Sequence, residues 1–410
     1  MSELYNLPDG WKWKTFDEVS TFIRGITFKP NQKFEEPDEN TIFCFRTTNI
    51  QSELDDSDLL NIDSTLVKSD EKIIINGDIL ISSANSLELL GKCCLIKNIN
   101  YKATLGGFIV CGRANKKILE TKYYYYFFSS ETNQNKMRNL ANKTTGIANL
   151  PIKKVEKEYI PIPPLSEQQR IVSKLDLIFE KIDKSIALHQ KNMDEANAFM
   201  GSVLNDVFGE LEEKYDLKSI GSFSKVGTGV TPLKNRNDFY DDGNINWITS
   251  KATNNDYVFE SEQLITKVAL EECRLKINPI GTIIVALYGQ GKTRGQVSEL
   301  MVESTTNQAL ATIVVDENQA MNTYLKYFLK KSYLDIRRKA SGGTQPNLNL
   351  SIIKSIELPL PPLNIQQKIV KYLDEISQKT EKIKQAQKDK MNSLKALKAS
   401  ILDQAFKGEL

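Results

Sequence analysis

Two long stretches of the chain place apolar residues three and four positions apart, which is the spacing of a heptad seam. The first lies within residues 166–208, which contain no proline. The seam positions are Val172, Leu175, Phe179, Ile182 and Ile186 in the first stretch, and Ile369, Leu373, Ile376, Ile383, Leu394 and Leu397 in the second. We therefore predict two long helices, each about 60 Å in length. Neither helix can bury its seam alone, so we expect an antiparallel coiled coil, with an ordinary bundle helix as the simpler alternative.

The starts of both helices carry similar signals. Each follows a Pro-Pro pair, and Ser166 with Gln169 has the spacing of a capping box. Asn364 and Gln367 repeat this arrangement. We therefore expect the helices to begin at these polar residues.

The rest of the chain alternates short β-branched runs with turns rich in Asn, Asp and Gly. Runs such as NGDILISS and GTIIVALYG predict strands, and the aromatic-rich segments near 121–130 and 321–332 predict helices. Gly25 and Gly229 are expected in turns that need a positive φ. The predicted fold class is α+β, with two mixed α/β domains joined by the two long helices.

The chain repeats itself. PIPPLSEQQRIV (161–172) aligns with PLPPLNIQQKIV (359–370) at an offset of 198 residues, with eight of twelve positions identical. The helices are alike, whereas the preceding blocks match only as pattern, so the helices share one task and the blocks have different targets. The repeat predicts pseudo-twofold symmetry and four parts, namely 1–164, 165–213, 214–362 and 363–410.

Charge is unevenly distributed among these parts. The chain carries 54 basic and 52 acidic residues, a net charge of +2. The sums are 0 for 1–164, −5 for 165–213, +3 for 214–362 and +4 for 363–410. Opposite charges on the two helices favour their pairing.

Composition excludes several classes of protein. His189 is the single histidine, which makes histidine-based catalysis or a histidine metal site improbable. The five cysteines lack disulfide or metal spacing, and no apolar run is long enough to span a membrane. We expect a cytoplasmic protein with buried thiols at Cys93 and Cys94.

One motif suggests a different function. ALYGQGKT (286–293) follows an apolar run and fits the loose form of a phosphate-binding loop, so a two-domain NTPase is an alternative. Its first position is alanine, however, and the RGQVSELMVESTT that follows makes a poor helix.

The duplicated arrangement resembles the specificity subunit of Type I restriction-modification systems. The resemblance rests on the twice-repeated P-[IL]-P-P-L-x-x-Q-Q-[RK]-I-V motif and on the FGEL and FKGEL helix ends, and it covers essentially the whole chain. GITF, GVTP and INWITSKATNND are smaller matches.

The resemblance implies a DNA-binding subunit that does no bond chemistry itself. Each variable block would be a target recognition domain for one half of a bipartite, asymmetric site in double-stranded DNA. The paired helices would set the gap between the halves and dock two methyltransferase (modification) subunits. The subunit itself would hold no cofactor, whereas the modification subunits would use S-adenosylmethionine and the restriction subunits ATP and Mg²⁺.

Polar and cationic side chains in loops are the candidates for reading bases and phosphates. They are Arg46, Thr47, Thr48, Asn49, Lys143, Thr144 and Thr145 in the first block, and Thr249, Ser250, Lys251, Lys292, Arg294, Ser341, Thr344 and Gln345 in the second. A coiled-coil scaffold without DNA contact is a further alternative.

The charge distribution generates one prediction. Because the blocks are nearly neutral, the isolated chain should bind duplex DNA more weakly than about 1 µM at physiological salt, with strong salt dependence. Fluorescence anisotropy across a salt series measures this affinity. Nanomolar binding by the chain without partner subunits would contradict the prediction.

Overall fold

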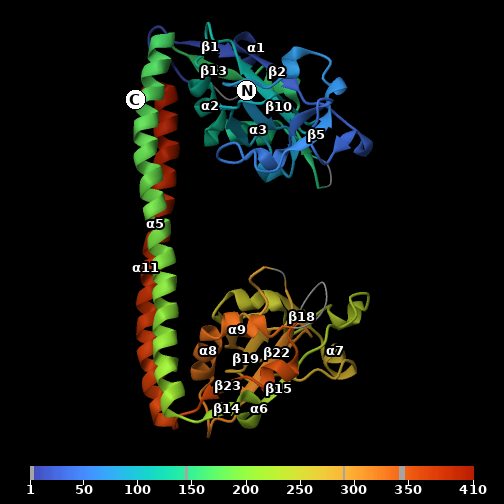
Figure 1. Ribbon diagram of the computed structural model, residues 1–410, viewed down its shortest axis with the longest axis vertical. Helices are drawn as coiled ribbons and strands as arrows, with labels where there is room; N and C mark the ends of the chain where they lie inside the picture. The colour runs from blue at the N-terminus through green and yellow to red at the C-terminus, as the bar shows by residue number, and fades with distance from the viewer. Residues whose placement is uncertain (1–3, 144–145, 290, 341–346) are drawn as a thin grey trace. The chain divides into compact units, whose positions relative to one another are not determined.

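The computed structural model describes residues 4–143, 146–289, 291–340 and 347–410 (Figure 1). It divides into two compact units. Unit 1 comprises residues 1–189 and 389–410, and unit 2 comprises residues 190–388. Each unit contains one β-rich domain and parts of both long helices. Unit 1 is formed by two separate stretches of chain, whereas unit 2 is one continuous stretch.

The core of unit 1 is a four-stranded antiparallel sheet in the order β2-β10-β6-β8. A second four-stranded sheet has the order β3-β5-β4-β9, and a three-stranded sheet has the order β11-β12-β7. β1 (Lys12–Thr15) pairs antiparallel with β13 (Tyr159–Ile162) where the domain meets the long helix. The remaining strands are β2 (Ser20–Arg24), β3 (Lys33–Phe34), β4 (Thr41–Phe45), β5 (Leu60–Asp63), β6 (Ile79–Ser82), β7 (Ala84–Asn85), β8 (Cys93–Leu95), β9 (Ala103–Leu105), β10 (Ile109–Ala114), β11 (Asn142–Lys143) and β12 (Ala148–Asn149).

Unit 2 repeats this plan. Its main sheet has the order β15-β22-β19-β20-β17, a smaller sheet has the order β18-β16-β21, and β14 (Leu217–Ser219) pairs with β23 (Glu357–Pro359). The other strands are β15 (Ser224–Thr228), β16 (Ile245–Ile248), β17 (Tyr257–Val258), β18 (Gln263–Ile265), β19 (Ile283–Ala286), β20 (Val297–Leu300), β21 (Thr305–Thr306) and β22 (Leu310–Val315).

Short helices cover these sheets. In unit 1 they are α1 (Phe16–Val19), α2 (Thr121–Ser129), α3 (Glu131–Leu140) and α4 (Ile152–Val155). In unit 2 they are α6 (Ile220–Phe223), α7 (Lys267–Glu272), α8 (Asn322–Lys331), α9 (Tyr333–Arg338) and α10 (Leu350–Lys354). The aromatic face of α2 buries Tyr123, Tyr124 and Phe128 completely, which explains the run of aromatic residues in the sequence.

The two long helices are α5 (Leu165–Lys214) and α11 (Leu363–Lys407), which lie side by side (Figure 1). In unit 1 the first part of α5 shares a core with the last part of α11, where Phe179 and Leu402 are both buried. In unit 2 the last part of α5 meets the first part of α11, where Phe208 and Leu373 share a core. The helices are therefore antiparallel, and the predicted α+β fold class is confirmed.

Both helices begin one residue earlier than the capping signals indicate. The Pro164 carbonyl accepts hydrogen bonds from the backbone N–H groups of Glu167 and Gln168, and the Pro362 carbonyl accepts equivalent bonds in the second half. Ser166 therefore lies inside the first turn and is not the N-cap. The preceding proline occupies the capping position because its carbonyl accepts the first helical hydrogen bond.

The seam of α5 is buried as expected at Val172, Leu175, Phe179 and Ile182, with Ile186 half-buried. The seam of α11 differs from the prediction at two positions, because Ile383 is 50% exposed and Leu397 is 48% exposed. Alternating steps of four and three residues from Leu373 instead place these inward positions on α11: Ser377, Thr380, Lys384, Gln387, Met391, Leu394 and Lys398. Polar residues occupy much of this seam, so the neighbouring apolar residues were mistaken for it.

This revised seam generates a second prediction. Leu373→Ala should lower the free energy of unfolding by about 2–5 kcal/mol, because the side chain is fully buried. Ile383→Ala, on the same helix, should change it by less than about 0.5 kcal/mol. Urea denaturation followed by circular dichroism compares the two. An equal decrease in the free energy of unfolding for both variants would show that Ile383 belongs to the seam.

Candidate nucleic-acid interface

The first candidate loop follows β4, where Phe45 is buried and the chain turns into a 3₁₀ helix over Thr47–Asn49. The Arg46 guanidinium lies 2.5 Å from the Asp58 carboxylate, and the Arg46 and Asp58 side chains are 32% and 80% exposed. Thr47 is half-buried and Thr48 is exposed. The loop therefore presents a cation and two hydroxyl groups near solvent.

The structure gives Asn49 a different role from the predicted DNA contact. Its side chain is 2% exposed, and its amide nitrogen donates to the carbonyls of Asp55 and Asp58. Its amide oxygen accepts from the backbone N–H of Arg46 at 2.6 Å. Since these bonds use both its donors and its acceptor, Asn49 holds the loop in shape and cannot also read a base.

The second predicted group in unit 1 lies in the segment that contains β11 and β12. Lys143 on β11 is exposed, and so is Asn149 on β12. Thr144 and Thr145 lie outside the described residues.

Three backbone hydrogen bonds connect these two groups. The Phe45 carbonyl accepts from Gly106 N–H at 2.9 Å, and the Phe108 carbonyl accepts from Ser83 N–H at 2.9 Å. The Ser83 carbonyl then accepts from Leu150 N–H at 2.8 Å. These bonds run from the end of β4 to the end of β12. The structure therefore brings the 46–49 loop and strand β12 to one end of the β-rich domain of unit 1.

Unit 2 contains the same three bonds. The Ile248 carbonyl accepts from Asn307 N–H at 3.0 Å, and the Ala309 carbonyl accepts from Leu287 N–H at 2.8 Å. The Leu287 carbonyl accepts from Leu348 N–H at 3.1 Å. We call this set of three bonds the loop frame. In both units it joins the loop after a central strand to the segment just before the domain's last short helix.

The predicted residues of unit 2 surround its loop frame. Thr249 precedes the 3₁₀ helix Ser250–Asn254, and Lys251 lies 2.8 Å from Glu262 with both side chains 69% exposed. Lys292 is exposed in the loop after β19, and Arg294 is half-buried. Ser341, Thr344 and Gln345 lie outside the described residues.

Gly25 and Gly229 are required for a different reason than the sequence suggests. Neither has a positive φ, so the expected turn conformation is wrong. A Cβ on Gly25 would lie 2.0 Å from the Gly106 carbonyl oxygen, and one on Gly229 would lie 1.6 Å from that of Thr306. Only glycine permits this close backbone approach beside the loop frame.

Two residues in the turns beside the loop frame are not predicted by the sequence, Phe108 and Gln308. Phe108 is 66% exposed in the turn that carries the second frame bond, and Gln308 occupies the corresponding turn of unit 2, where its side chain accepts from Thr231. Thr231 belongs to the GVTP segment, so that motif was a usable signal. Nothing in the local sequence marks Phe108.

The comparisons with known proteins address what this arrangement is for. Residues 8–197 and 212–393 each match the family model described as the Type I restriction modification DNA specificity domain. The chain belongs to this family.

Individual relatives agree with the assignment. The chain is 25% identical over 422 residues to the StySPI specificity subunit of Salmonella potsdam, with 98% of this chain and 90% of the relative covered. It is 29% identical over 212 residues to the EcoKI specificity subunit of Escherichia coli K12, with 51% and 45% covered. A solved structure concerned with complex assembly of the type I R-M system has a TM-score of 0.73 over 99% of this chain and 100% of that chain, at 20% identity, which supports the fold.

The protein is thus a DNA specificity subunit of a Type I restriction-modification system, a non-catalytic recognition component. The alternative of a phosphate-loop NTPase is wrong for a geometric reason. The loop after β19 leads into β20, which pairs antiparallel with β19, whereas a phosphate-binding loop leads into a helix. Arg337 donates to the carbonyls of Gly291 and Arg294, so part of this loop's backbone turns carbonyls toward a cation.

Cys93 and Cys94 of the specificity subunit are buried, as expected, and so are Cys44 and Cys111, whereas Cys273 is half-buried. Burial raises the pKa of Cys44 to about 12 and that of Cys94 to about 12, so both thiols stay protonated at neutral pH. Across the described part of the chain no cluster of three or more His, Cys, Asp or Glu side chains could hold a metal ion. A search of the same residues finds no helix long and apolar enough to cross a membrane.

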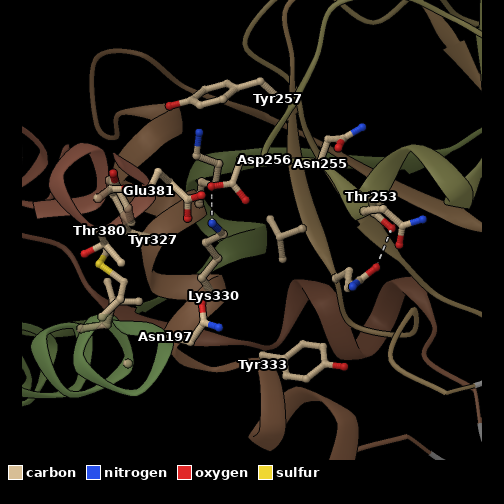
Figure 2. Close-up of a pocket in the computed structure, with 18 of the residues that line it drawn as sticks. Asn197, Thr253, Asn255, Asp256, Tyr257, Tyr327, Lys330, Tyr333, Thr380 and Glu381 are labelled. Atoms are coloured by element: carbon tan, nitrogen blue, oxygen red, sulfur yellow. Dashed lines mark hydrogen bonds and ion pairs between the residues drawn. The ribbon is translucent and has the colours of Figure 1, made fainter. Parts of the chain in front are cut away.

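A pocket of about 920 Å³ in unit 2 is lined in part by Thr253–Tyr257, at and after the end of the 3₁₀ helix Ser250–Asn254 (Figure 2). Lys330 on α8 pairs with Asp256 at 2.5 Å, and Thr253 contacts Gln296 at 3.5 Å (Figure 2). Lys326, also on α8, pairs with Glu299 at 2.8 Å, with side chains 2% and 10% exposed. The Lys330–Asp256 pair therefore anchors the 249–256 segment to α8, and the Lys326–Glu299 pair joins α8 to β20.

The geometry of the 46–49 loop generates a third prediction. Asn49→Ala should lower the free energy of unfolding by about 1–3 kcal/mol, because it leaves the Arg46 N–H and the Asp55 carbonyl without a partner. The Asp58 carbonyl loses one of its two donors and keeps the Arg46 guanidinium. Thr48→Ala, next to Asn49 and exposed, should change stability by less than about 0.5 kcal/mol. Thermal denaturation tests both variants, and an Asn49→Ala variant as stable as Thr48→Ala would contradict the positioning role.

Proposed function

We propose that each recognition domain binds one half of a bipartite, asymmetric site in double-stranded DNA through the loops around its loop frame. The observation that carries this proposal is the repetition of the same three frame bonds in both units while the loop residues around them differ. A common frame with different polar side chains fits two domains that have one task and two targets.

The proposed contacts in the first domain are the polar and cationic residues that the sequence predicts in its loops, except Asn49, which is a positioning residue. They are Arg46, Thr47, Thr48, Lys143, Thr144 and Thr145. Arg46 is held by Asp58, whose side chain is 80% exposed. Ion pairs at such exposed sites contribute about 0–1 kcal/mol, so a DNA phosphate or a guanine edge can replace the carboxylate at little cost.

The proposed contacts in the second domain follow the same logic. They are Thr249, Ser250, Lys251, Lys292, Arg294, Ser341, Thr344 and Gln345. Both side chains of the Lys251–Glu262 pair are exposed. The Lys251 cation can therefore exchange its carboxylate partner for DNA at little cost, as proposed for Arg46.

We propose further that 165–213 and 363–410 act as spacer helices between recognition domains 1–164 and 214–362, and that they dock two methyltransferase subunits. Exposed apolar side chains on the helices support the docking role. Leu177 and Leu188 on α5 are 56% and 61% exposed, and Tyr372 on α11 is 50% exposed. The modification subunits supply S-adenosylmethionine chemistry, and restriction subunits supply ATP- and Mg²⁺-dependent cleavage, in the cytoplasm.

A domain exchange tests the modular part of the proposal. Replacing residues 1–150 with the corresponding block of a related specificity subunit should change one half of the methylated sequence and leave the other half unaltered. The measurement is genome-wide mapping of methylated adenines in cells that express the chimera with its modification subunit. A change in both halves, or in neither, would show that the domains do not read DNA separately.

The unaltered chain with the same modification subunit is the control. It should give one bipartite sequence with a fixed gap. The absence of any bipartite methylated sequence from this control would overturn the proposed function itself.

A further inference from the structure

The first turn of α5 contains a fully buried glutamine whose side chain bonds the first recognition domain to the helix. Gln168 has no exposed surface. Its amide nitrogen donates to the carbonyls of Ile118 and Pro163, both at 2.9 Å, and its amide oxygen accepts from the Glu120 N–H at 2.8 Å. One side chain therefore joins three segments: the helix, the Pro-Pro linker before it and the turn before α2.

Gln366 repeats this arrangement in the first turn of α11. It is also fully buried. Its amide nitrogen donates to the carbonyls of Gln319 and Pro361 at 2.9 and 2.7 Å, and its amide oxygen accepts from the Met321 N–H at 2.9 Å. The two glutamines are 198 residues apart, which is the offset of the repeat.

On each long helix, an aspartate about two turns after the glutamine makes a second contact, with a tyrosine of the recognition domain. The Tyr126 hydroxyl donates to Asp176 at 2.6 Å, and the Tyr327 hydroxyl donates to Asp374 at 2.6 Å. Burial first, and then the hydrogen bond to the aspartate, raises the pKa of both phenols above the usual value of 10. The hydroxyl groups therefore remain donors throughout the physiological pH range.

Two separated contacts along a helix fix the direction of a domain better than one contact does. At each junction the glutamine holds the first turn of the helix and the tyrosine holds a position eight residues later, so the domain cannot tilt about a single point. Because one base-pair step of duplex DNA is about 3.4 Å, a tilt that moves the recognition loops by a few ångströms amounts to one step along the DNA.

Glutamine is the side chain that this site requires. It offers two N–H donors to two carbonyls and one oxygen to an N–H group. Glutamate has nearly the same shape but no N–H donors, so its carboxylate would face two carbonyl oxygens in a buried site. Leucine would leave all three backbone groups without a partner.

We propose that Gln168 and Gln366, supported by Tyr126 and Tyr327, are positioning residues that set which gap between half-sites the enzyme accepts. This inference rests on the proposed function, because it requires two domains that read separate half-sites. The glutamines touch no DNA and act through the orientation of the recognition domain on its own helix.

The experiment uses the specificity subunit assembled with its modification subunit. Wild-type half-sites and gap are first mapped from methylated adenines, and DNA substrates are then made with that gap and with gaps one base pair shorter and longer. Tyr126→Phe should reduce the preference for the wild-type gap about tenfold, the equivalent of one lost hydrogen bond, while both half-sites stay the same. Gln168→Glu removes two donated hydrogen bonds and should reduce the preference at least as much. Gln366→Glu and Tyr327→Phe should act alike.

The adjacent glutamines provide matched controls. Gln169 and Gln367 are exposed, and Gln169→Glu or Gln367→Glu makes the same chemical change in the same helical turn. These controls should keep the wild-type gap preference. Tyr126→Phe removes only a hydroxyl group, so it decides the matter if Gln168→Glu fails to fold.

Two results would overturn the inference. One is a folded Tyr126→Phe or Gln168→Glu variant with an unchanged gap preference. The other is an equal loss of methylation at all three gaps, which would mean that the residues only stabilise the fold. A wild-type complex that recognises no bipartite site would instead reject the proposed function.

Discussion

The structure depends on a constraint that applies to any long helix with a one-sided apolar seam, which is that another surface must cover the seam. Here the cover comes from the second copy of the same element within the chain. The last turns of α11 complete the core of unit 1, where Phe406 packs edge-on against Tyr123 and Phe127. The first recognition domain therefore cannot finish its core until residues near the end of the chain have joined it.

The fold was largely predictable from the sequence because its strongest signals are periodic. The seam of α5, the repeat offset and the β-branched runs identified the long helices, their pairing and the two mixed domains. Prediction failed where polar residues replaced apolar ones at inward positions. Lys384 and Gln387 occupy the seam of α11, and apolar periodicity then points to Ile383, which lies one position away from it.

The candidate interface was less predictable, because polarity in a loop does not say which way a side chain points. Thr48 and Asn49 are adjacent and equally suited to DNA, yet one is exposed and the other holds the loop together. The glutamine pair in the repeated motif was visible, but only burial shows that Gln168 fastens the domain and Gln169 does not. Gly25 was marked correctly as special, although close approach of two backbones is the cause.

The electrostatics of the recognition loops help to explain how a nearly neutral domain can select DNA. Arg46 and Lys251 each have a carboxylate partner within the protein, so the free loops attract phosphate only weakly. A base edge or a phosphate of the DNA must then compete with that carboxylate for the cation. Only a well-placed acceptor of the DNA replaces the carboxylate. Partial neutralisation of this kind lowers non-specific affinity more than specific affinity.

The loop frame consists only of backbone N–H and C=O groups. The same three bonds form in both units although most of the residues that make them differ, whereas the glycines beside the frame, Gly25 and Gly229, are common to both. Substitutions in the loops therefore change the chemical surface without removing the bonds that hold the loops in place. In a specificity subunit built this way, exposed loop positions such as Thr48 can change at a small cost in folding stability, whereas buried loop positions such as Asn49 cannot.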